Sequence, residues 1–201
     1  MMIPVLAVDD PTAACEQLAC HFGFQKRDGL MWLGTQAISV LKTGDQPTGF
    51  VALPLDHIAL SVTDAAEACR LFSGRGATYS KSHTPDGLRE IPEFWDNGVR
   101  FVFFEGPMSA PLEFCETIGI APQAREMNHD HYGIRRMDFE KTVLDLQELG
   151  AVQIARHRLL ATNDTINVMF LRWSDSVLEL FDERSVHAPT PHGWTGFLQI
   201  G

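Results

Sequence analysis

The sequence lacks the features that mark membrane and secreted proteins. No apolar run approaches the roughly 20 residues that a membrane-spanning helix requires. The first apolar stretch, IPVLAV, is short, has no basic flank and is followed at once by two aspartates, unlike a secretory signal peptide. We therefore expect a protein that works away from the membrane.

Positive charge and cysteine are also scarce. The 16 Lys and Arg residues are outnumbered by 26 Asp and Glu residues, so the formal net charge is -10. A nucleic-acid binder needs a basic surface, which this composition does not provide. The four cysteines form no CxxC pair and no framework typical of a secreted domain. These patterns predict free thiols and a cytoplasmic protein without a nucleic-acid partner.

What the sequence does contain is an internal repeat. LDHIALSVTDAAEACRLFSGRGA (residues 55–77) aligns without a gap with HDHYGIRRMDFEKTVLDLQELGA (residues 129–151). Both copies have an Asp-His pair, an Asp where a helix is expected to begin and a Gly-Ala pair where it is expected to end. Each copy therefore predicts a strand followed by a helix with an aspartate N-cap and a glycine stop.

Three strand-like runs follow each copy. They are rich in β-branched and aromatic residues and are bounded by turn residues. In the first unit they cover residues 77–83, 99–105 and 110–116, and in the second unit 151–161, 166–173 and 176–182. The sequence thus predicts an α+β fold with tandem βαβββ modules.

A fainter third copy opens the chain. Val8 aligns with Val62 and Asp10 with Asp64, and short strands are expected around residues 29–33 and 37–41. We divide the chain near Thr48, into a degenerate module at residues 1–48 and a pair of modules within 49–201, at about 54–118 and 128–184. The degenerate module either covers a sheet edge or meets its counterpart in a homodimer.

Histidine and glutamate fall at equivalent places in the two complete modules. His57 and His131 occupy the same point of the first strand, and Glu113 and Glu179 the same point of the last strand. Each one alone is open to a plainer interpretation, a hydrogen-bonded core residue. However, an unpaired carboxylate within an apolar strand is costly, and repeats that pack together bring equivalent positions face to face. The set predicts a divalent metal site for Zn, Ni, Co, Mn or Fe. The N-terminal copy has Ile3 and either Ser39 or Val40 at these positions, so no metal is expected there.

On these residues the chain resembles the vicinal oxygen chelate superfamily, and glyoxalase I in particular. Members of that superfamily pair βαβββ modules into curved mixed sheets around a metal held by His, Glu, His and Glu in that order. The resemblance covers about two-thirds of the chain clearly and the N-terminal unit loosely. It implies a metal that chelates two neighbouring oxygens of a small substrate and stabilises developing negative charge. It also implies a metal-ligating glutamate as general base, for which Glu113 and Glu179 are equal candidates.

The substrate is less well defined by the sequence. Ser61 and Thr117 stand where glyoxalase I has an Arg and an Asn that bind glutathione, which argues against glutathione. Arg135 shares a strand face with His131 and is a candidate anchor for an anionic group, with a structural ion pair as the alternative. An insertion between Ser82 and Val99 places Trp95 either over the cavity, where it would stack on a substrate, or as a packing anchor.

Three functions fit this pattern. The first is a metal-dependent lyase or isomerase of the glyoxalase type. The second is an oxygenase or ring-opening enzyme of the same superfamily, although ring-cleaving dioxygenases normally use only one carboxylate. The third is a non-catalytic binding protein like the bleomycin-resistance members, which usually lack metal ligands. Because all four ligand positions are filled, we expect the first.

Overall fold

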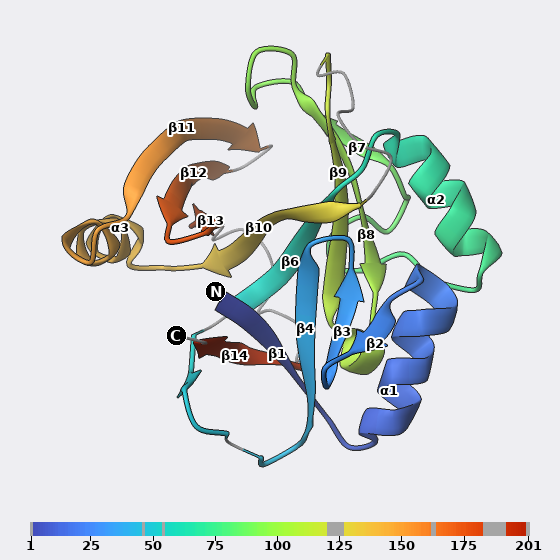
Figure 1. The fold of residues 1–201 in the computed structure, drawn as a ribbon. Helices are drawn as coiled ribbons and strands as arrows, with labels where there is room; N and C mark the ends of the chain where they lie inside the picture. The colour runs from blue at the N-terminus through green and yellow to red at the C-terminus, as the bar shows by residue number, and fades with distance from the viewer. Residues whose placement is uncertain are drawn as a thin grey trace.

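The structure is a computed structural model that describes residues 2–45, 47–53, 55–119, 127–161, 164–182 and 192–199. Its described strands form one eight-stranded and one six-stranded sheet, with helices on the outer side of both (Figure 1). No helix among the described residues is long and apolar enough to span a membrane. The architecture is the α+β arrangement of curved mixed sheets that the sequence predicted.

The eight-stranded sheet contains the two complete repeats, with strand order β11-β12-β13-β10-β6-β9-β8-β7. The first repeat comprises β6 (Leu55–Ser61), α2 (Ala65–Gly74), β7 (Arg89–Ile91), β8 (Val99–Glu105), the short 3-10 helix η2 (Pro107–Ser109) and β9 (Pro111–Thr117). The second comprises β10 (Asn128–Arg135), α3 (Phe139–Glu148), β11 (Val152–Ala161), β12 (Asp164–Trp173) and β13 (Ser176–Phe181). In each repeat the first strand pairs in parallel with the last, and the repeats join through the antiparallel pair β6–β10. The two modules are therefore related by pseudo-twofold symmetry.

Local sequence signals define the helices of these repeats. Asp64 caps α2 by accepting a hydrogen bond from the backbone N–H of Glu67 at 2.9 Å. Asp138 occupies the same N-cap position of α3, but its side chain makes no such cap bond. Gly76 and Gly150 both have a φ of +91°, the left-handed conformation that ends a helix at low cost. The predicted strand–helix–stop pattern is confirmed in both copies.

One predicted strand is wrong. Residues 77–83 form only an isolated bridge, between Tyr79 and Phe104, and the chain then turns away, with the Thr84 N–H donating to the Ser80 carbonyl. Hydroxyl and imidazole groups in this segment satisfy one another, as Ser80 Oγ does with His83 Nδ1 at 3.1 Å, which favours a turn. The edge position is taken instead by β7, from within the expected insertion.

The six-stranded sheet holds the N-terminal unit, with strand order β2-β3-β4-β1-β14-β5. The unit comprises β1 (Met2–Val8), α1 (Pro11–Gln17), the short π-helix η1 (Leu18–Phe22), β2 (Gln25–Arg27), β3 (Leu30–Leu33) and β4 (Gln36–Lys42). Two strands from later in the chain complete it, β5 (Phe50–Val51) and β14 (Trp194–Gln199). Strand β1 pairs with β4 on one side and with β14 on the other. The C-terminal strand therefore covers an edge of β1 that would otherwise be unpaired. The boundary near Thr48 stays a prediction, and the predicted end of the second module at residue 184 lies outside the described residues.

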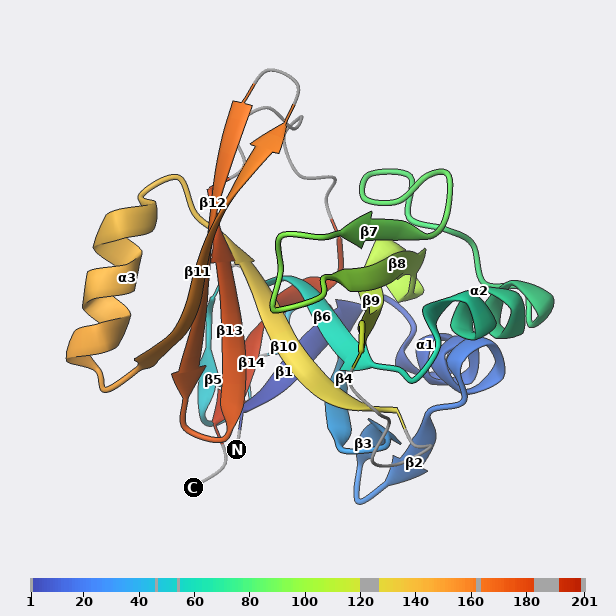
Figure 2. The ribbon, with the colours of Figure 1, turned by 90° about the horizontal axis from the view of Figure 1, so that it is seen from above.

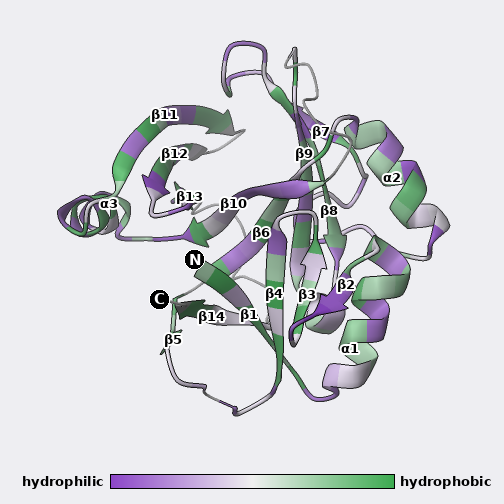
Figure 3. Cartoon of the chain, viewed as in Figure 1, coloured by the Kyte–Doolittle hydropathy of each residue, from purple (hydrophilic) through white to green (hydrophobic). Residues whose placement is uncertain are grey.

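A single apolar core joins the N-terminal unit to the first complete module. Phe22 of η1 is 1% exposed, and its ring centroid lies 5.5 Å from that of Phe72 in α2 and 6.0 Å from that of Phe114 in β9. Helices α1 and α2 accordingly lie side by side in two perpendicular views (Figures 1 and 2). The strands and helices around this core carry both apolar and polar segments (Figure 3), as amphipathic elements do.

Candidate metal centre

The four predicted ligand residues lie on the four central strands of the eight-stranded sheet. His57 is on β6, Glu113 on β9, His131 on β10 and Glu179 on β13. Strand pairing sets Gly133 of β10 opposite His57 and also beside Glu179. All four ligand candidates line one cavity of about 570 Å³. The fold therefore gathers side chains from positions 122 residues apart, from 57 to 179, into one site.

Their donor atoms lie close together. His57 Nε2 lies 3.2 Å from Glu113 Oε2 and 3.4 Å from Glu179 Oε2. His131 Nε2 lies 3.3 Å and 3.4 Å from the same two oxygens, and the two Nε2 atoms are 3.4 Å apart. Neighbouring ligands of one ion, each bound at about 2.0–2.3 Å, lie about 3–3.5 Å from each other. Ligand atoms of His57, Glu113 and His131 all lie within 4.8 Å of one another, a spacing that can hold a metal ion, and Glu179 Oε2 lies 3.4 Å from both imidazole nitrogens.

Burial and the neighbouring charges shift the pKa values of these four side chains in opposite directions. Burial favours the neutral form of Glu179, but the charge and hydrogen bonds of His131 and His57 outweigh it and lower the pKa of Glu179 to about 2. The pKa of Glu113 is lowered by the same two imidazoles against the same effect of burial. Burial likewise favours neutral imidazoles, yet the carboxylates around them raise the pKa values of His57 and His131 well above their ordinary value. A buried site so rich in carboxylate needs cationic charge, which protons or a metal ion can supply.

Each candidate ligand histidine is oriented by the aspartate that precedes it. His57 Nδ1 donates to Asp56 Oδ1 at 3.1 Å, and His131 Nδ1 donates to Asp130 Oδ1 at 2.7 Å. With Nδ1 as the donor to the aspartate, Nε2 faces the other donor atoms and is the nitrogen available to a metal ion. The repeated Asp-His pair in the sequence was the signal for this role, but the sequence analysis assigned the aspartates no function.

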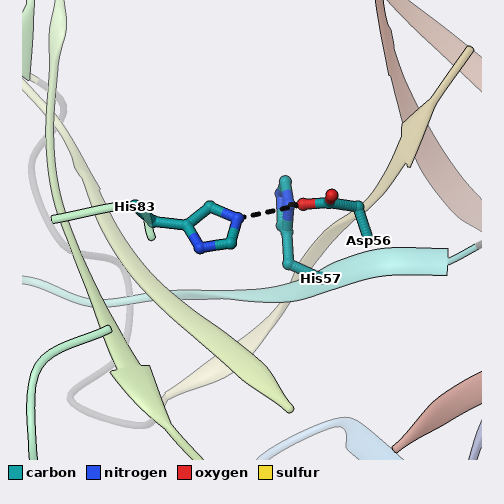
Figure 4. A group of neighbouring side chains, drawn as sticks. All are labelled: Asp56, His57 and His83. Carbon is teal, nitrogen blue, oxygen red and sulfur yellow. Dashed lines mark hydrogen bonds and ion pairs between the residues drawn. The ribbon is translucent and has the colours of Figure 1, made fainter. Parts of the chain in front are cut away.

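Asp56 also accepts hydrogen bonds from two side chains other than His57. Figure 4 shows the His83 ring pointing at the Asp56 carboxylate, where His83 Nε2 donates to Oδ1 at 3.1 Å. Arg135 Nε donates to Oδ2 of the same carboxylate at 3.2 Å. Burial raises the pKa of Asp56, but the hydrogen bonds and charges of His57 and His83 outweigh this effect and hold that pKa well below its usual range. Arg135 thus takes part in the ion pair considered as its alternative role, while it also lines the cavity.

The insertion in the first module reaches across to the second module. Phe94 is 5% exposed, and its ring lies 4.8 Å from that of His157 and 5.4 Å from that of Phe170. Trp95 packs on Phe170 at 5.1 Å but remains 39% exposed, and it lines the cavity. Phe94 is the buried anchor of the insertion. Trp95 therefore stands at the cavity wall with part of its surface accessible.

The N-terminal unit stands apart from this cavity. Within the part of the chain that the structure describes, no residue from 3–41 lines it. The expectation that this unit contributes no group to the site agrees with this arrangement.

Comparison with known proteins places the fold. No protein-family model matches the sequence, and no curated protein matches it. Among solved structures, glyoxalase I from Zea mays is 14% identical, with a TM-score of 0.64, and the match covers 97% of this chain and 72% of that one. A mutant of 4-hydroxymandelate synthase from Streptomyces coelicolor is 11% identical, with a TM-score of 0.60. That match covers 92% of this chain and 70% of the synthase chain.

These likenesses show the fold, that of tandem βαβββ modules. The chain has the fold of the vicinal oxygen chelate superfamily, as the resemblance in its sequence predicted. At these levels of identity the likeness extends to the fold alone. The activity must therefore be argued from the site.

Proposed function

We propose that the chain binds one divalent metal ion through His57, Glu113, His131 and Glu179 and is a metal-dependent lyase or isomerase. Its substrate is a small molecule that presents two neighbouring oxygens. The observation that carries this proposal is the convergence of two imidazole nitrogens and two carboxylate oxygens in one buried cavity. Two nitrogens and two oxygens suit Zn, Ni, Co, Mn or Fe.

A bound divalent ion would supply Lewis-acid stabilisation of negative charge that develops on the substrate oxygens. The chain's own part is to hold the donors and to move a proton. Glu113 or Glu179 accepts the proton from one carbon and returns it to the neighbouring carbon, as a carboxylate that can leave its ligand position is able to do. Phe103 and Phe170, which pair across the strands with Glu113 and Glu179, place apolar surface beside the site of transfer.

Two further residues are proposed to contact the substrate. Arg135 lines the cavity beside its ion pair with Asp56. We propose that it also orients an anionic or carbonyl group of the substrate. Trp95 is proposed to stack on the substrate, because its partly exposed ring lines the cavity.

The oxygenase and the non-catalytic binding protein remain the alternatives. A second ligating carboxylate provides the base that an isomerase needs and that a ring-cleaving dioxygenase normally lacks. We also propose that the protein forms a homodimer and that it works in the cytoplasm. All four thiols are free, which agrees with a reducing compartment.

Metal reconstitution tests this function. The protein is stripped with a chelator, reloaded separately with Zn, Ni, Co, Mn or Fe(II), and analysed for metal content and melting temperature. We expect one equivalent of metal, a higher melting temperature with the metal bound, and loss of both effects in His131→Ala. A metal content near zero after reloading would refute the site.

The reaction class needs a separate assay. Small α-hydroxy ketones and α-ketoaldehydes are incubated with the reloaded protein in D2O, and deuterium incorporation next to the carbonyl is followed by NMR. We expect metal-dependent incorporation without oxygen consumption. Oxygen uptake by the Fe(II) form would favour the oxygenase, and neither signal with any metal would favour a binding protein.

A further inference from the structure

Apolar side chains from two strands line the cavity on either side of the four ligand candidates. Alternation along a strand sends Val99, Phe101 and Phe103 of β8 to the cavity face. On the opposite side, Ile166, Val168 and Phe170 of β12 do the same. The sheet curves so that β8 and β12 face each other across the ligand strands (Figure 1). Two apolar walls therefore flank the four ligands.

Aromatic rings lie directly beside the ligands. Strand pairing sets Phe103 opposite Glu113 and Phe170 opposite Glu179, at equivalent places in the two repeats. The Phe103 ring lies 5.0 Å from the His57 ring, edge to face, and the Phe170 ring lies 5.7 Å from the His131 ring. A substrate group that projects from the metal thus meets a phenyl ring on either side.

Two large apolar side chains are exposed at the mouth of the cavity. Leu160 lines the cavity and is 82% exposed, and Trp95 lines it and is 39% exposed. Large apolar groups exposed at the rim of a cavity mark a surface that an apolar ligand covers. A cavity of about 570 Å³ is of the size that a small-molecule ligand fills.

Beyond the four ligand candidates, the charged side chains that line the cavity are exposed at its rim or already have an ion-pair partner. The lining residues Arg89, Glu90 and Glu93 are all exposed at the rim. Of the inner groups, His83 and Arg135 both engage the Asp56 carboxylate. A peptide-like substrate such as glutathione would lose its hydration against these walls without a comparable set of partners.

We propose that the substrate carries a flat apolar group, an aryl ring, next to its pair of chelating oxygens. This proposal rests on the proposed function, because the metal must hold the oxygens. The ring lies between the walls of β8 and β12, where Phe101, Phe103 and Phe170 contact its faces and edges. Specificity therefore comes from burial of the ring, and the chelating oxygens fix its orientation.

A pair of chelators that differ only in their apolar group tests this inference. Acetohydroxamate and benzohydroxamate present the same two neighbouring oxygens, the first with a methyl and the second with a phenyl group. Both are titrated into the Co(II)-loaded protein, and binding is followed by the visible absorption of cobalt. We expect benzohydroxamate to bind about 30-fold more tightly, the effect of burying roughly 80 Å² of extra apolar surface. The affinities of both probes for free Co(II) give the baseline.

Variants locate the origin of that preference. Phe101→Ala is expected to reduce the ratio of the two affinities to about 5 or less, whereas Phe101→Leu keeps most of it. Leu144→Ala, on the exposed face of α3, is the matched control and should leave the ratio unchanged. The ratio does not depend on the fraction of folded protein, so partial unfolding of a variant does not obscure it.

The outcomes separate the two proposals. If Co(II) does not bind to the stripped protein, the proposed metal site is wrong, and the substrate class falls with it. If Co(II) binds but the two probes differ by less than about threefold, the metal site stands and the aryl inference is overturned. A large ratio that survives Phe101→Ala unchanged would also overturn the inference, because the β8 wall would not be its source.

Discussion

Gly133 lies directly across the β6–β10 pair from His57, and a methyl group added to its Cα would come within 2.0 Å of the His57 Cε1 atom. The imidazole of the first ligand therefore occupies the space that any other residue at position 133 would fill. Glycine is needed here for this close approach and not for its backbone freedom, because its φ is not in the left-handed region.

We predict that Gly133→Ala weakens metal binding by at least tenfold, because His57 must rotate away from the shared centre. A displacement of a ligand by about 1 Å is enough to disrupt a preorganised site. Gly74→Ala is the matched control, since a methyl group there meets nothing within 4 Å. Metal affinity is measured by competition with a chromophoric chelator. Unchanged affinity in Gly133→Ala would show that His57 is not a ligand or adapts freely.

The aspartate that precedes each candidate ligand histidine should affect metal affinity almost as strongly as the histidine itself. Asp56→Asn keeps the shape of the side chain but removes the charge that fixes the His57 ring through Nδ1. We predict a 10- to 100-fold loss of metal affinity, the usual effect of removing such a partner. Asp145→Asn, at an exposed ion pair with Lys141, is the control and should bind metal normally. Equal affinities in the two variants would argue against the orienting role.

The two glutamates should differ in function although the repeat makes them equivalent in position. A ligand that also serves as base has two roles, and Gln keeps one oxygen donor but cannot accept the proton. At saturating metal, we predict that one of Glu113→Gln and Glu179→Gln loses turnover by about 100-fold or more, while the other retains partial activity. The measurement is the rate of substrate proton exchange. Equal and mild losses in both variants would move the oxygenase and binding functions ahead of the isomerase.

The N-terminal unit should stabilise the protein without taking part in chemistry. Phe22→Ala empties a fully buried position in the core shared with α2 and β9, and we predict a loss of about 3–5 kcal/mol in the free energy of unfolding. The matched control is Leu149→Ala, a side chain that is 67% exposed, which should change stability by less than about 0.5 kcal/mol. Denaturant unfolding followed by fluorescence gives both values. Two separate transitions, with only one shifted by Phe22→Ala, would mean that the N-terminal unit folds independently.

The repeat and its ligand pattern were open to prediction because they rest on local rules. Periodicity, the aspartate before each helix and the glycine after it are encoded within about 25 residues of one another. Equivalent positions in two copies pack symmetrically, so the grouping of His57 with His131 and of Glu113 with Glu179 followed from the alignment. The strand predicted at residues 77–83 failed because hydrogen bonds among Ser80, Ser82 and His83 outweigh a weak strand propensity.

What only the tertiary structure decided depends on contacts between segments distant in sequence. The Asp-His repeat was visible, but the convergence of His57, His83 and Arg135 on Asp56 arises where β6 and β10 meet the turn before β7. The need for glycine at position 133 follows from the register of two antiparallel strands, which a shift of one residue would abolish. The pairing of β14 with β1 closes the N-terminal sheet with residues from the other end of the chain. Sequence fixes which residues share a strand face, whereas the pairing of distant strands within one curved sheet determines which of them meet.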